Sequence, residues 1–191
     1  TQAFVNLKLG NLALRLMDLG HSPHKVMSEL AADDPQFNYR QVGIFNAENA
    51  IAVHTGSNTR PWAGHLTGEG YIVMGNVLAG EEVLQAMAET FEEQEQADLD
   101  ERLLCSLKAG RDAGGQANAD GIHLNERSAA VITHGHRDFG HIDLRVDANE
   151  AAVDELRRVH DIYKPFIPYY EMRHHCPQDT PAQDVWARDN L

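Results

Sequence analysis

The chain has 191 residues, a formal net charge of −13 at pH 7 and 42% hydrophobic residues. These values are ordinary for one globular domain, and the acidic charge argues against binding to nucleic acid or to an anionic membrane surface. No apolar run approaches the length of a membrane span. Two cysteines, Cys105 and Cys176, make no disulfide framework, so we expect a cytoplasmic protein.

Hydrophobic periodicity predicts helices and strands in separate blocks. In chain order these are helices over 11–19 and 22–33, strands over 41–46, 50–55 and 70–76, helices over 83–91 and 99–107, strands over 128–133 and 142–147, and a helix over 153–162. The stretch from Thr55 to Gly70 is predicted to be a loop, as is the stretch from Gly110 to Gly121.

The segregated blocks indicate an α+β layered domain rather than alternating βαβ units. We expect this domain to span residues 1–163, followed by an irregular C-terminal extension over 164–191. Two strands ahead of the first helix would balance the layers. Apolar residues in the extension favour a homo-oligomer; these are Phe166, Ile167, Tyr169 and Tyr170.

The first residue is Thr1 rather than methionine. A threonine with a free α-amine can act as a catalytic unit, because its hydroxyl attacks a carbonyl while its own amine takes the proton. A proteolytic nick or a truncated chain would also leave such an end. Both readings stay open at this point.

Several short motifs resemble an uncharacterised bacterial family, domain of unknown function 1028. They are Thr1–Ala3, Arg40–Gly43, Thr55-Gly56, Trp62–His65, Gly68–Gly70, Gly75–Gly80, Arg127–Ala130 and Asp143–Asp147. The likeness runs from Thr1 to about His160. That family is similar to the N-terminal-nucleophile (Ntn) hydrolases.

The resemblance implies a four-layer αββα sandwich in which the leading strands come from a separate N-terminal fragment of the same precursor, released by autoproteolysis. It also implies a hydrolase that cleaves a C–N bond in a small amide or cyclic amide, without metal or organic cofactor. The alternative is a non-catalytic module on the same fold that binds a cell-wall fragment or another small molecule.

In the hydrolase reading, Thr1 is the nucleophile, and Asn76 with Gly75 stabilises the oxyanion. Gly75-Asn76 can equally be a turn that leads into the next helix. Five residues in or beside the 55–70 loop are candidates for binding substrate, because long loops are often functional; these are His54, Thr55, Arg60, His65 and Glu69. An ordered surface loop would explain them as well.

Three histidines lie close together in the predicted hairpin near residue 135: His134, His136 and His141. No carboxylate or cysteine spacing completes a metal site there. A solvated turn without metal is the favoured interpretation.

Overall fold

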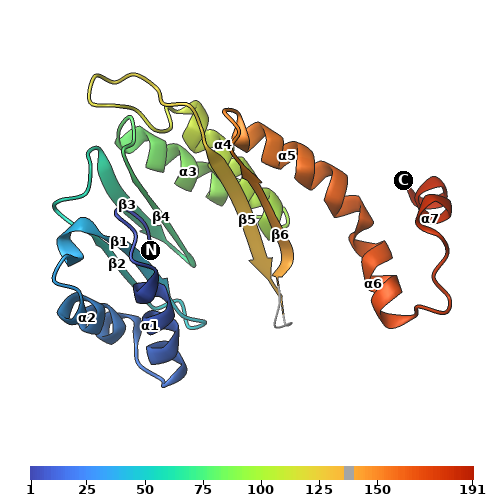
Figure 1. Cartoon of the computed structure of the whole chain (residues 1–191), viewed down its shortest axis with the longest axis horizontal. Coiled ribbons are helices and arrows are strands. Elements are labelled where there is room, and N and C mark those ends of the chain that lie inside the picture. The colour runs from blue at the N-terminus through green and yellow to red at the C-terminus, as the bar shows by residue number, and fades with distance from the viewer. Residues whose placement is uncertain (136–139) are drawn as a thin grey trace. The chain divides into compact units, whose positions relative to one another are not determined.

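The chain divides into two units, residues 1–125 and 126–191, in the computed structural model, which describes residues 1–135 and 140–191 (Figure 1). The first unit begins with two helices, α1 (Leu7–Asp18) and α2 (Pro23–Asp33). The side chain of Ser22 caps α2 by accepting a hydrogen bond from the Lys25 N–H, and Pro23 fills the first turn, where no N–H is needed. Both predicted helices are confirmed.

A hairpin follows, formed by β1 (Gln41–Phe45) and β2 (Ile51–Thr55) after a short 3₁₀ turn, η1 (Phe37–Tyr39). The connection is an Asx-type turn: Oδ1 of Asn46 accepts from the N–H groups of Glu48 at 3.1 Å and Ala50 at 2.9 Å. The hairpin predicted from alternating hydrophobic residues is confirmed.

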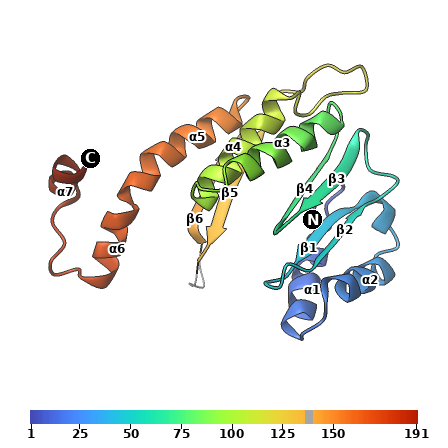
Figure 2. The ribbon, with the colours of Figure 1, turned by 180° about the vertical axis from the view of Figure 1, so that it is seen from behind.

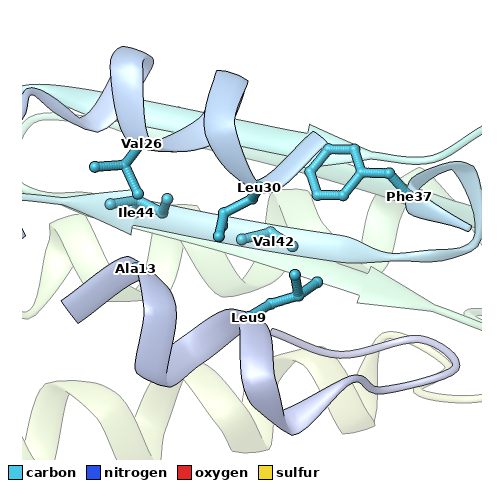
Figure 3. Close-up of a cluster of buried hydrophobic side chains, with 7 residues drawn as sticks. All are labelled: Leu9, Ala13, Val26, Leu30, Phe37, Val42 and Ile44. Atoms are coloured by element: carbon cyan, nitrogen blue, oxygen red, sulfur yellow. The ribbon is translucent and has the colours of Figure 1, made fainter. Parts of the chain in front are cut away.

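One face of β1 packs against α1 and α2. The buried side chains of this core are shown in Figure 3: Leu9, Ala13, Val26, Leu30, Phe37, Val42 and Ile44. Because strand side chains alternate between faces, Gln41 and Gly43 are turned away from the two helices. A methyl group built on Gly43 would lie 3.2 Å from Ile72, so this second face of β1 lies against a neighbouring strand.

The neighbouring hairpin contains a strand that the sequence did not predict. It is formed by β3 (Ala63–Gly68) and β4 (Tyr71–Asn76). The prediction of one loop from Thr55 to Gly70 is therefore wrong over β3. Two glycines of β3, Gly64 and Gly68, interrupt the alternation of hydrophobic and polar residues by which a strand is predicted. Both positions are crowded by aromatic rings: a Cβ at Gly64 would lie 2.4 Å from the Trp62 ring, and one at Gly68 would lie 2.2 Å from the Tyr71 ring.

The helices α3 (Glu81–Glu93) and α4 (Leu99–Asp112) complete the first unit. Val73 of β4 is buried with Leu84 and Ala88 of α3. The two views show α1 and α2 on one side of the β1–β2 hairpin, with α3 and α4 beyond the β3–β4 hairpin (Figures 1 and 2). The two hairpins contact each other through β1 with β4 and through β2 with β3.

The second unit contains the hairpin of β5 (Ser128–His134) and β6 (Gly140–Asp147), with α5 (Ala152–Tyr163) packed on both strands. The sequence suggested an irregular C-terminal extension. The structure instead has a 3₁₀ turn (Lys164–Phe166) and two helices there, α6 (Ile167–His175) and α7 (Gln183–Asn190). Aromatic contacts stabilise these helices, because the Trp186 ring lies 5.3 Å from Tyr169 and 5.9 Å from Phe166.

The α+β class predicted from the sequence is confirmed. The described strands pair as three two-stranded antiparallel sheets, β1–β2, β3–β4 and β5–β6, where the sequence suggested five strands in two sheets. Among the described residues, no helix is both long enough and apolar enough to cross a membrane.

Candidate active site

A buried glutamine joins the two hairpins of the first unit. Gln41, the first residue of β1, has no exposed surface. Its backbone exchanges two hydrogen bonds with Gln2, at 2.8 and 2.9 Å, so the segment before α1 lies antiparallel to β1. The side chain of Gln2 then donates from Nε2 to Oε1 of Gln41 at 2.7 Å. The two glutamines therefore share one face.

The other end of the Gln41 amide reaches across to the second hairpin. Its Nε2 lies 2.8 Å from the carbonyl oxygen of Gly64, 2.9 Å from that of Gly75 and 2.9 Å from Oγ1 of Thr55, so its two N–H groups are shared among three acceptors. A carbonyl oxygen can only accept, so these contacts fix which end of the amide carries the nitrogen. We call Gln2, Gln41, Thr55, His65 and Asn76 the Gln41 cluster.

Within this cluster, a hydroxyl and an imidazole form a direct pair. Oγ1 of Thr55 lies 2.8 Å from Nδ1 of His65. The Thr55 hydroxyl donates to Nδ1 when that nitrogen is unprotonated and accepts from it when it carries the proton, so the direction of the bond follows the tautomer of the ring. Burial lowers the pKa of His65 below its ordinary value of 6.5, and the charge of nearby His54 lowers it further. Both effects favour the neutral ring, which has one tautomer able to accept the hydroxyl proton at Nδ1.

The titration of His65 tests the effect of burial on this ring. A histidine with a lowered folded-state pKa binds fewer protons when folded, so its contribution to the free energy of unfolding is complete above about pH 6.5 and is lost as the pH falls through the folded pKa. We expect the His65 ring, assigned by its loss in His65→Gln and followed by NMR, to titrate below 6.5. A midpoint at or above that value would contradict the lowered pKa and the neutral state of this ring near pH 6.5.

Gly75 and Asn76 are the last two residues of β4, and both contact Gln41. Gly75 contributes its carbonyl oxygen to Gln41, while Nδ2 of Asn76 donates to Oε1 of Gln41 over a long 3.5 Å. The backbone oxygen of Asn76 accepts from the side chain of Gln116 at 3.3 Å. Asn76 and Thr55 thus share Gln41 as a hydrogen-bond neighbour, and the Asn76 side chain is held by a long contact.

Thr1 does not join this group in the structure. It is exposed, and its methyl carbon lies 3.9 Å from the position of a Cβ built on Gly10 of α1. Since adjacent residues of an extended segment point to opposite faces, the contact of Gln2 with the cluster turns Thr1 toward α1. The expected meeting of Thr1 with Asn76 is therefore not seen.

The other three residues predicted to bind substrate, His54, Arg60 and Glu69, are not members of the Gln41 cluster and lie apart from one another. His54 is on the α2 side of β2, where its ring stacks on Phe37 at 4.3 Å and its Nε2 lies 3.2 Å from the Phe37 carbonyl oxygen. Arg60 lies over the Phe4 ring, 5.4 Å from its centre. Glu69 is exposed in the turn between β3 and β4, at the opposite end of that hairpin from Asn76.

An ionic anchor holds the segment that carries Gln2. Nε of Arg40 donates to Asp34 at 2.9 Å, and the Arg40 guanidinium also donates to the carbonyl oxygen of Phe4. Asn6 donates to the same carboxylate at 3.2 Å. The hydrogen bond from Arg40 is the main cause that lowers the pKa of Asp34. These contacts keep Gln2 aligned with Gln41.

A groove of about 670 Å³ opens beside β2, between α2 and β3. Its walls include Met27 and Ser28 of α2, Val53 and His54 of β2, and Thr67 of β3. We call it the α2–β2 groove. His54 and Thr55 point to opposite faces of β2, and no residue of the Gln41 cluster is among those that line this groove.

Gln2 and Gln41 were not predicted as site residues, although both belong to motifs that resemble the family, Thr1–Ala3 and Arg40–Gly43. The sequence feature that could have identified Gln41 is a glutamine on a strand whose other face is apolar. An amide in such a position needs hydrogen-bond partners, and within the described part of the chain every buried side-chain polar atom has one.

The histidine hairpin stays untested. His136 lies outside the described residues, so the expectation of a turn without metal between His134 and His141 remains a prediction.

These features describe an α+β protein with a glutamine-centred polar cluster between two hairpins. The model of the family of unknown function DUF1028 matches residues 1–156, and the chain belongs to this family, as its motifs indicated. Protein SPO2555 from Silicibacter pomeroyi, also described as DUF1028, matches with a TM-score of 0.74 at 24% identity, over 86% of this chain and 70% of that one. This likeness shows a shared fold. No curated protein matches.

Proposed function

We propose that the protein is a hydrolase that cleaves the C–N bond of a small amide. The observation that carries this proposal is the 2.8 Å contact between the Thr55 hydroxyl and the His65 imidazole, with the buried Gln41 amide 2.9 Å from the same hydroxyl oxygen. A hydroxyl within hydrogen-bond distance of an imidazole is the pairing of nucleophile and general base from which an activated nucleophile is built.

The reaction would proceed in two steps. Oγ1 of Thr55 attacks the amide carbonyl carbon while its proton passes to Nδ1 of His65. The C–N bond then breaks as His65 returns that proton to the leaving amine, which leaves an ester on Thr55. Water attacks the ester with His65 again taking the proton, and the acid departs as Thr55 regains its hydrogen.

The developing oxyanion needs a donor beside the attacked carbon. The Asn76 amide suits this role because its own hydrogen bond to Gln41 is long, at 3.5 Å, so turning toward a substrate oxygen costs little. The Gly75 carbonyl oxygen acts indirectly, since it helps to fix the Gln41 amide. In this proposal Thr55 supplies the nucleophile in place of Thr1, whose side chain lies toward α1.

We also propose that the complete fold is the four-layer αββα sandwich of the Ntn hydrolases. The order of packing in the first unit supports this: α1 and α2 on the β1–β2 hairpin, the β3–β4 hairpin against it, and α3 on the outer side.

Two measurements on the purified protein test the activity. We expect release of 4-nitroaniline from hexanoyl-4-nitroanilide, and covalent acylation of one residue by a β-lactone that carries a hexyl chain. Peptide mass spectrometry should place the acyl group on Thr55, because the lactone traps a nucleophilic hydroxyl as an ester.

An adduct on Thr1 would support an N-terminal nucleophile and refute the role of Thr55. If neither turnover nor an adduct is found with a broad set of neutral amides, the protein is the non-catalytic binding module that the sequence left open.

A further inference from the structure

We propose that Gln2 is a positioning residue of this site, which satisfies the buried side-chain oxygen of Gln41 and so leaves the Asn76 amide free to bind a substrate oxygen. This inference rests on the proposed function for the role of Asn76 as the oxyanion donor. Gln2 takes no part in the reaction steps themselves and acts through its two neighbours.

The side-chain oxygen of Gln41 is a buried acceptor that two amides approach. Gln41 has no exposed surface. Nε2 of Gln2 lies 2.7 Å from this oxygen, whereas Nδ2 of Asn76 lies 3.5 Å from it, at the outer limit for a hydrogen bond. A buried acceptor needs at least one donor. Gln2 meets this need, so the oxygen does not require the Asn76 amide.

The Gln2 amide also contacts the strand that carries Asn76. Its Nε2 lies 3.2 Å from the carbonyl oxygen of Met74, two residues before Asn76 on β4. The two N–H groups of Gln2 thus have two acceptors. Among the described residues, the long contact with Gln41 is the one hydrogen bond of the Asn76 side chain. Asn76 is therefore the less strongly held of the two amides.

The backbone that presents Gln2 is held in a costly conformation. Ala3 and Phe4 have φ angles of 55° and 41°, in the left-handed region that residues other than glycine rarely adopt. Hydrogen bonds hold both sides of this turn: Gln2 exchanges two with the Gln41 backbone, and Arg40 donates to the carbonyl oxygen of Phe4. Residues held in such conformations cluster at functional sites, which supports a functional role for the side chain that this turn presents.

Loss of the Gln2 amide would change the partner of Asn76. In Gln2→Met the side chain keeps its length but no longer donates, so the Gln41 oxygen loses its short hydrogen bond. Because an unsatisfied buried acceptor is costly, we expect the Asn76 amide to move onto this oxygen. Asn76 must then break that bond before it can donate to a substrate oxygen.

The NMR signals of side-chain NH₂ groups report these hydrogen bonds without turnover. In the wild-type protein, the Gln2 amide should exchange with solvent more slowly than the Asn76 amide; each is assigned by its loss in Gln2→Met and Asn76→Ala. In Gln2→Met, exchange at Asn76 should slow by roughly threefold to tenfold, the effect of one ordinary hydrogen bond. Slower exchange at Asn76 than at Gln2 in the wild type, or unchanged exchange at Asn76 in Gln2→Met, would overturn the inference.

Gln116→Met is the matched control. Gln116 is exposed and donates to the backbone oxygen of Asn76 at 3.3 Å, but it does not contact the Gln41 side chain. Its loss should leave exchange at the Asn76 side chain unchanged within about twofold. Equal slowing in Gln116→Met and Gln2→Met would show that any disturbance beside Asn76 has this effect, and would refute a particular role for Gln2.

Kinetics distinguish positioning from a purely structural role. Gln2→Met should lower kcat for hexanoyl-4-nitroanilide by roughly threefold to tenfold with little change in KM, because the Asn76 amide binds the oxyanion in the transition state. In the Asn76→Ala background, Gln2→Met should cause no further loss, since Gln2 acts through Asn76. Losses that multiply in the double variant would show that Gln2 acts independently and would contradict the proposal.

The exchange and turnover results also separate this inference from the proposed function. Slower exchange at Asn76 in Gln2→Met, with no turnover and no adduct on Thr55, would support the control of Asn76 by Gln2 and refute the hydrolase. Turnover with an adduct on Thr55, but with unchanged exchange at Asn76 in Gln2→Met, would support the hydrolase and refute the positioning role of Gln2.

Discussion

Replacement of Gln41 by leucine is expected to destabilise the first unit by about 2–6 kcal/mol. The substitution keeps the side-chain volume but removes the donor to the carbonyl oxygens of Gly64 and Gly75. Each buried acceptor left without a partner costs about 1–3 kcal/mol. The Gln2 amide also loses its 2.7 Å acceptor.

Urea denaturation followed by tryptophan fluorescence measures this loss. The chain has two tryptophans, Trp62 in the first unit and Trp186 in the second, so a Trp186→Phe background isolates the relevant signal. Gln36→Leu is the matched control, because Gln36 is exposed and should tolerate the change within about 0.5 kcal/mol. Equal stabilities for the two variants would show that the Gln41 hydrogen bonds contribute nothing.

Thr55→Val is expected to lower kcat/KM for a neutral anilide by roughly 10³-fold or more, because it removes the nucleophile and keeps the shape of the side chain. His65→Gln should cause a loss of roughly 10²–10⁴-fold, since an amide cannot take the proton. The double variant should be no slower than the worse single variant, because the two groups act as a unit.

Thr90→Val serves as the control for these kinetics. Thr90 lies on α3, outside the Gln41 cluster, so its loss should leave kcat/KM unchanged within about twofold. Near wild-type turnover by Thr55→Val, in a protein that retains its wild-type circular dichroism spectrum, would place the nucleophile elsewhere.

Much of the fold could be predicted because its elements have strong patterns. Val42 with Ile44 and Ile51 with Val53 alternate as a half-buried hairpin does, and Ser22-Pro23 marks a helix start. The strand β3 escaped prediction because Gly64 lacks the side chain on which such a pattern depends. Its glycine is explained by the approach of the Trp62 ring, which is a tertiary contact.

The candidate site was predicted only in part, for a related reason. Thr55, His65 and Asn76 were identified by residue type and motif, and the structure brings them to one cluster. Gln41, which joins them, belongs to a different hairpin from His65 and Asn76, and its partners are set by how two hairpins pack. Periodicity along one segment carries no information on such a contact.

The Gln41 cluster also has a consequence for the order of folding. Each hairpin closes a short loop, whereas Gln41 lies 39 residues from Gln2 and 34 from Gly75. Closing these longer loops costs more chain entropy, and little is recovered until both partners are already in place. We therefore expect the hairpins to form first and the glutamine bridge to lock them together late. Substitutions at Gln41 should then act mainly by accelerating unfolding rather than by slowing folding.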